Sequence, residues 1–178
     1  MAYFPMCVDL TGKLVYVIGS GPQAEQKAQV LRPFGPQLRQ QGTFNQADAE
    51  EGPALVVVGD LPLEEAEKIV QICRRYGIAV NVVDVPQLCS FYFPSLLTRG
   101  PLTVSVSSGG GCPAGAAYLR RRVEQALPEH TEQVLLWLTQ QRQMLRQRGI
   151  LKSAVEMAFA MDRPLTQQEL AQLQKQMT

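Results

Sequence analysis

Short apolar runs alternate with segments of helical spacing along the first half of the chain. The runs lie at Leu14–Ile18 and within Ala54–Asp60 and Ile78–Asp84, and such runs are typical of strands that are buried on both faces of a parallel sheet. Residues 22–31 and 61–77, which separate them, carry their apolar residues at helical spacing. Strands that alternate with helices in this way predict βαβ units and a Rossmann-like parallel sheet of the α/β class.

The sheet is expected to be shortened, because the connection between its first and second long runs is weak. Residues 35–53 contain one plausible short strand, Gln37–Gln40, followed by polar residues. A further strand is predicted within Gly100–Ser108, where apolar and hydroxyl side chains alternate. The chain therefore divides into a Rossmann-like region, residues 1–112, and a helical carboxy-terminal region, residues 113–178.

The carboxy-terminal region is helical in pattern throughout. A helix follows Pro113, and from His130 onward apolar residues recur at helical spacing, with a break at Arg163-Pro164. After the break, Thr166 and Glu169 have the spacing of a capping box, which predicts the start of a last helix.

Composition narrows the function classes. The 178 residues include 46% apolar and 19% charged residues with a net charge of +1, so no polyanionic partner such as nucleic acid is expected. No apolar run approaches the roughly 20 residues that span a bilayer, and the start lacks a signal peptide, which predicts a cytoplasmic protein without a membrane segment. The four cysteines form no CxxC pair, so no metal site is predicted.

The first chemical signal is the turn Gly19–Ala24, which matches G-x-G-x-x-G/A between a strand and a helix. This motif binds the pyrophosphate of a dinucleotide at the helix start, although a tight turn without a ligand has the same pattern. The acid that should bind the adenosine ribose about 20 residues further on is missing, since the next strand ends in Arg39-Gln40-Gln41.

Two further signals follow later strands. Asp84 ends the third apolar run, where a carboxylate could act as a base or orient a substrate, or could only cap the turn. The Ser/Gly loop, Ser107–Gly111, precedes a helix. Its amides could hold a carboxylate or phosphate, or Ser108 could only cap that helix.

These segments together resemble a known family. The turn Gly19–Ala28 and the stretch "NVVDVPQLCSFYFPSLLTRGPLTVSVSSGGGCPAGAAYLRRRVEQALP" resemble the precorrin-2 dehydrogenase and sirohydrochlorin ferrochelatase family, which includes the amino-terminal module of sirohaem synthase. The resemblance implies NAD-dependent oxidation of precorrin-2 to sirohydrochlorin in sirohaem biosynthesis, with iron insertion in some members. It also implies a homodimer whose carboxy-terminal helices complete a tetrapyrrole cleft.

The resemblance assigns candidate residues by motif position. Asp84 is the catalytic candidate. The candidates for substrate binding are Asn81, Ser95, Arg99, Ser107, Ser108 and Gly109. The candidates for NAD binding are Gly19, Ser20, Gly21, Pro22, Gln23, Ala24, Gly59 and Asp60. Two alternatives remain: a ferrochelatase-like enzyme, and a non-catalytic tetrapyrrole-binding protein with a degenerate nucleotide site.

Overall fold

The computed structural model describes residues 4–176, which divide into two compact units between Phe93 and Pro94. The sequence-based boundary lies later, after residue 112, and so includes the predicted strand within Gly100–Ser108 in the first region. That strand instead pairs in a separate hairpin of the second unit.

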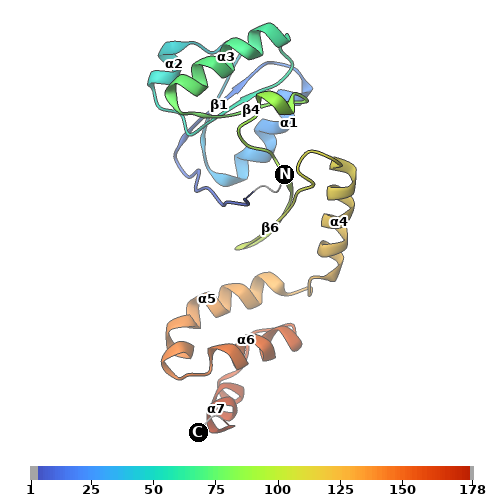
Figure 1. Ribbon diagram of the computed structural model, residues 1–178. Coiled ribbons are helices and arrows are strands. Elements are labelled where there is room, and N and C mark those ends of the chain that lie inside the picture. Colours follow the sequence, from blue (N-terminus) through green and yellow to red (C-terminus); the bar gives the residue numbers. More distant parts are fainter. Residues whose placement is uncertain (1–3, 177–178) are drawn as a thin grey trace. The chain divides into compact units, whose positions relative to one another are not determined.

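The first unit contains a parallel four-stranded sheet with the order β2-β1-β3-β4. Figure 1 labels β1 and β4 of this sheet together with α1, α2 and α3. The strands are β1 (Leu14–Ile18), β2 (Gln37–Gln41), β3 (Leu55–Val58) and β4 (Ala79–Val82). All three pairings are parallel, which confirms the Rossmann-like α/β fold that the alternating pattern predicts. The helices are α1 (Pro22–Leu31), α2 (Gln46–Glu50) and α3 (Leu63–Tyr76), with short 3-10 turns η1 (Arg32–Phe34) and η2 (Pro86–Leu88).

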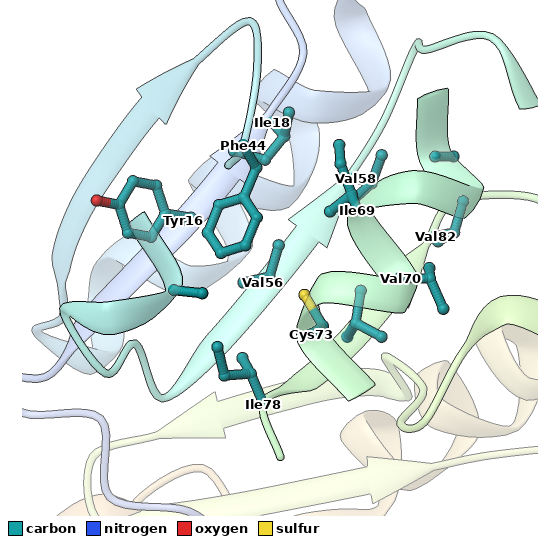
Figure 2. Packing of buried hydrophobic residues seen from close by; sticks show 13 residues of the cluster. Tyr16, Ile18, Phe44, Val56, Val58, Ile69, Val70, Cys73, Ile78 and Val82 are labelled. Atoms are coloured by element: carbon teal, nitrogen blue, oxygen red, sulfur yellow. The ribbon is translucent and has the colours of Figure 1, made fainter. Parts of the chain in front are cut away.

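The helices cover both faces of this sheet, since alternate residues of each strand point to opposite sides. Tyr16 and Ile18 of β1 pack with α2 and α3, whereas Val15 and Val17 pack with α1. Figure 2 shows the α3 side, where the Phe44 ring lies beside Tyr16 at 5.3 Å between ring centroids. Both faces of the strands are therefore buried, which explains their continuous apolar runs.

The weak segment, residues 35–53, does complete the sheet. Strand β2 pairs with β1 from Leu14↔Gln37 to Ile18↔Gln41, close to the short strand that the sequence predicts. The sequence did not predict α2, a helix of five residues that is too short to show a helical period. Asn45 caps the start of α2, because its side chain accepts hydrogen bonds from the backbone N–H groups of Ala47 and Asp48.

The second unit begins with the antiparallel hairpin of β5 (Ser95–Arg99) and β6 (Leu102–Val106). The sequence did not predict β5. The unit continues with α4 (Pro113–Ala126), α5 (Thr131–Gln147), α6 (Leu151–Ala160) and α7 (Gln167–Gln176). The last three helices share an apolar core around Leu145, Ile150 and Leu170. Across residues 4–176, no helix has the length and hydropathy that crossing a membrane requires.

Candidate functional site

The strand order places a ligand site at one point of the first unit. From β1 the chain adds β2 on one side and then returns to add β3 on the other. Ligands of open parallel sheets bind beyond the carboxyl ends of the strands where the order reverses in this way. Gly19 follows β1 and Gly59 follows β3, so the predicted glycine turn lies at this switch point.

Two glycines allow the strand ends and α1 to approach closely. Gly19 has a φ of +117°, and a Cβ atom there would overlap the carbonyl group of Gly59. A Cβ atom on Gly59 would lie 2.9 Å from the backbone nitrogen of Ala24. A side chain at either position would therefore push α1 away from the sheet.

The group beside Gly21 is a carboxylate of the protein, where the motif predicts the pyrophosphate of a dinucleotide. A Cβ atom on Gly21 would overlap the carboxylate of Asp60, and the N–H of Ala24 donates a hydrogen bond of 2.9 Å to Asp60 Oδ2. Asp60 follows β3 and has a φ of +57°. The carboxylate of Asp60 therefore lies at the start of α1, where the motif would bind a pyrophosphate.

A hollow of about 350 Å³ opens beyond the carboxyl ends of β2 and β3. Its lining comes from the segment after β2, the segment after β3 and one side of α3: Gly42, Thr43, Phe44, Leu61, Glu65, Lys68 and Ile69. Phe44 and Ile69 supply apolar surface and the segment 42–44 supplies backbone amides, so the hollow could hold a flat heterocycle such as adenine. Sequence analysis missed it because Phe44 lies in a stretch interpreted as a polar connection.

Asp84 lies beyond the end of β4, as predicted, and is held by α1. Gln23 donates a hydrogen bond of 2.7 Å from Nε2 to Asp84 Oδ2. Asp84 has a φ of +62°, a conformation that costs a non-glycine residue about 1 kcal/mol. The exposed carboxylate of Asp84 is thus connected directly to the start of the helix that follows the glycine turn.

Lys27 is a candidate that sequence analysis did not single out. It lies one helical turn after Gln23 on α1, and its Nζ is 4.7 Å from the centroid of the Phe93 ring. Burial lowers the pKa of Lys27, and the opposing influences of Asp84 and Cys89 are smaller. The sequence feature that could have identified Lys27 is its spacing of four residues from Gln23, because side chains at i and i+4 share one helix face.

Asn81 has a supporting position in this structure. Its side chain is 6% exposed, and Nδ2 donates to the Phe91 carbonyl at 2.9 Å and to Cys89 Sγ at 3.4 Å. These bonds fix the segment after Asp84 to β4. The amide of Asn81 is therefore already used within the protein.

The other predicted substrate residues belong to the second unit. The hydroxyl of Ser108 accepts a hydrogen bond from the backbone N–H of Cys112, which precedes α4, and that of Ser107 accepts one from Gly109. Arg99 donates to the Pro128 carbonyl at 3.0 Å, and Ser95 pairs with Val106 at the start of the hairpin. The side chain that caps α4 is instead that of Cys112, whose Sγ accepts a hydrogen bond of 3.3 Å from the Gly115 N–H, and the Ser/Gly loop is exposed.

Within residues 4–176 the structure contains no group of three or more His, Cys, Asp or Glu side chains arranged to bind a metal ion. The four cysteines are free thiols.

Comparison with known proteins gives a consistent set of relatives. The chain is 38% identical over 148 residues to "Siroheme synthase 2" of Aeromonas hydrophila, covering 73% of this chain and 32% of that protein. It is 32% identical over 168 residues to "Siroheme synthase" of Nitrosomonas eutropha, covering 83% and 35%. The chain therefore spans about a third of the length of the curated relatives that it matches.

Two further matches concern the fold. Residues 37–95 match a family described as putative NAD(P)-binding, a range that begins after the glycine turn. The solved structure of "SirC, precorrin-2 dehydrogenase" superimposes with a TM-score of 0.69 and 15% identity, covering 98% of each chain. The Rossmann-like sheet followed by a helical region is thus an arrangement already seen in a solved protein.

Proposed function

Because this chain is a relative of the siroheme synthases, we propose that it oxidises precorrin-2 to sirohydrochlorin with NAD as the hydride acceptor. One observation supports this proposal most strongly. Gln23, inside the glycine motif, donates a hydrogen bond of 2.7 Å to Asp84, so the candidate cofactor turn and the candidate catalytic carboxylate are in contact.

The residues at the switch point fit a dinucleotide in two respects. Gly19 and Gly59 keep the turn between β1 and α1 free of side chains, and the hollow beside Phe44 would accept the adenine ring. The end of β2 carries Gln41 in place of the usual acid, so the ribose would meet neutral groups. NAD, when bound, supplies the hydride-accepting ring.

Asp84 has the position and the chemistry for the proton part of this oxidation. Loss of a hydride from the macrocycle must be accompanied by loss of a proton, which a carboxylate close to the cofactor turn can accept. The hydrogen bond from Gln23 leaves the second oxygen of Asp84 available for that task. We assign to Gln23 the orientation of Asp84 and to Asp84 the acceptance of the proton.

The second unit carries hydrogen-bond donors of its own that we assign to the substrate. A tetrapyrrole of this type carries several carboxylate arms, which need hydrogen-bond donors. The exposed loop Ser107–Gly111 and the start of α4 carry such donors. Ser108 would keep its hydrogen bond from the Cys112 N–H while neighbouring amides bind an arm of the substrate.

We also propose that the chain works as a homodimer in the cytoplasm. Tyr118 and Leu119 on α4 are 56% and 55% exposed, so a second copy could cover them. Sedimentation analysis should give twice the chain mass, and a monomer at micromolar concentration would exclude the dimer. Cell fractionation that recovers the protein outside the cytoplasm would exclude that location.

An assay of precorrin-2 oxidation tests the proposed activity. The wild-type protein should convert precorrin-2 only when NAD⁺ is present, and Asp84→Asn should lower kcat by about 100-fold or more while folding normally. Asp9→Asn is the matched control, since Asp9 precedes β1 at the opposite end of the sheet. Full turnover by Asp84→Asn would remove Asp84 from the mechanism.

A non-catalytic tetrapyrrole-binding protein is the second candidate, and the position of Asp60 favours it. The Asp60 carboxylate is bonded to the Ala24 N–H at the start of α1, which opposes a pyrophosphate there. This candidate predicts that sirohydrochlorin binds while NAD⁺ does not bind and precorrin-2 is not converted.

A further inference from the structure

The start of α1 has few donors left for a phosphate group. A helix offers its first four N–H groups, which have no partner within the helix, to an anion. Here Gly21 is the residue before the helix, Pro22 has no N–H, and the N–H of Ala24 donates to Asp60 Oδ2 at 2.9 Å. The donors that remain are those of Gly21 and Gln23.

The carboxylate of Asp60 also adds a negative charge at this point. It lies against Gly21, because a Cβ atom on Gly21 would overlap it. A pyrophosphate placed at this helix start would meet that charge at short range, where like charges repel strongly. The same carboxylate is favourable in the absence of a ligand, since the helix dipole stabilises an anion at its amino-terminal end.

We propose that Asp60 limits the affinity of this chain for dinucleotides, because its carboxylate and the pyrophosphate compete for the Ala24 N–H. The inference rests on the proposed function, in that it concerns the same cofactor turn. It changes the role of Asp60 from a group that holds the cofactor to one that the cofactor must displace.

The carboxylate of Asp60 can move away from the start of α1. Asp60 has a φ of +57°, a left-handed conformation that costs a non-glycine residue about 1 kcal/mol. Its side chain is exposed, so rotation away from α1 places the carboxylate in water. Gly59 and Leu61, on either side, are part of the turn between β3 and α3.

Two substitutions remove the charge without straining this backbone. Asp60→Asn and Asp60→Gly both tolerate a positive φ. The matched control is Asp9→Asn, the same chemical change at the opposite end of the sheet, where Asp9 accepts a bond from Thr11. Calorimetric titration of each protein with NAD⁺, ADP-ribose and adenosine separates the pyrophosphate from the adenine ring.

Both Asp60 variants should bind NAD⁺ and ADP-ribose about tenfold more tightly than the wild type, because a charged competitor is removed. Adenosine, which has no pyrophosphate, should bind all four proteins equally, and Asp9→Asn should match the wild type. The gain for ADP-ribose should shrink with added salt.

Three results would contradict this role for Asp60. If the variants bind ADP-ribose no more tightly than the wild type, the competition is overturned while the proposed cofactor use stands. If they bind it more weakly, Asp60 is a ligand of the cofactor. If none of the proteins binds NAD⁺ or ADP-ribose at millimolar concentration, the competition and the NAD-dependent function are both overturned.

Discussion

Lys27 is a candidate for substrate binding that the sequence motifs did not include. Its Nζ lies over the Phe93 ring, and none of the carboxylates in residues 4–176 comes within ion-pair distance of it. A half-buried ammonium group without a close counter-ion favours an anionic ligand. We therefore expect Lys27 to meet a carboxylate arm of the tetrapyrrole beside Asp84.

Substitution and pH test this expectation together. Lys27→Met should weaken sirohydrochlorin binding about tenfold, whereas Lys13→Met, an exposed control before β1, should not. Because burial lowers the pKa of Lys27, the wild type should lose affinity on the alkaline side at a lower pH than an ordinary lysine would. Lys27→Arg should bind without this loss, since arginine stays charged. Identical pH profiles for the wild type and Lys27→Arg would contradict the assignment.

The four thiols are expected to react in two classes. Burial raises the pKa of Cys73 to about 12 and also raises the pKa of Cys89, whereas Cys7 and Cys112 are exposed. Thiolates are the reactive form, so a thiol reagent should modify Cys7 and Cys112 in the native protein, and Cys73 and Cys89 only after unfolding in urea. Mass mapping identifies the modified residues. Rapid modification of Cys73 in the native protein would contradict its burial.

At the scale of elements, the turn between β1 and α1 depends on close backbone packing as well as on φ. Gly12 and Gly19 both have a positive φ, but a Cβ atom on Gly12 meets nothing within 4 Å and one on Gly19 overlaps Gly59. Gly12→Ala should therefore lower the free energy of unfolding by about 1 kcal/mol, and Gly19→Ala by at least about 2 kcal/mol more. If urea unfolding shows that both substitutions lower the free energy of unfolding equally, the close packing of Gly19 against Gly59 contributes nothing to stability.

The start of α7 contains the capping box that the spacing of Thr166 and Glu169 predicts. The backbone N–H of Thr166 donates to Glu169 Oε2 at 2.7 Å, and the N–H of Glu169 donates to Thr166 Oγ1 at 3.3 Å. Arg163 adds a bond of 2.6 Å to Glu169 Oε1. Hydrogen bonds from Arg163, and then those from Thr166, lower the pKa of Glu169 from 4.5 to about 2.

This pKa shift makes part of the stability of the helical region pH-dependent. A lowered pKa in the folded state stabilises the protein above the unfolded value of 4.5, and the contribution disappears as the pH falls to about 2. Glu169→Gln should therefore melt a few degrees below the wild type at pH 7. Trp137 lies on α5 in the same unit, so its fluorescence can follow the transition. A melting difference that persists unchanged near pH 2 would contradict this assignment.

At the scale of the whole molecule, the sequence predicted the elements that have a clear period or a continuous apolar run. It predicted β1, β3, β4, β6, α1, α3 and the carboxy-terminal helices, and it placed a short strand close to β2. It missed α2 and β5. A helix of five residues shows no period, and Ser95–Arg99 becomes a strand only through its pairing with Leu102–Val106.

The sequence predicted the motifs of the candidate site, but it could not predict the hydrogen bonds that join them. The glycine turn and Asp84 follow from strand ends, which the sequence shows. The bond from Gln23 to Asp84, and the one from Ala24 to Asp60, join residues 61 and 36 positions apart. Such contacts depend on the order of the strands, and no local pattern in the sequence encodes them.

The measurement that tests the central claim most directly is the stoichiometry of precorrin-2 oxidation by the wild-type protein under anaerobic conditions. We predict that sirohydrochlorin and NADH form in equal amounts, and that neither forms when NAD⁺ is omitted. Tight sirohydrochlorin binding without any NADH formation from precorrin-2 and NAD⁺ would contradict the account.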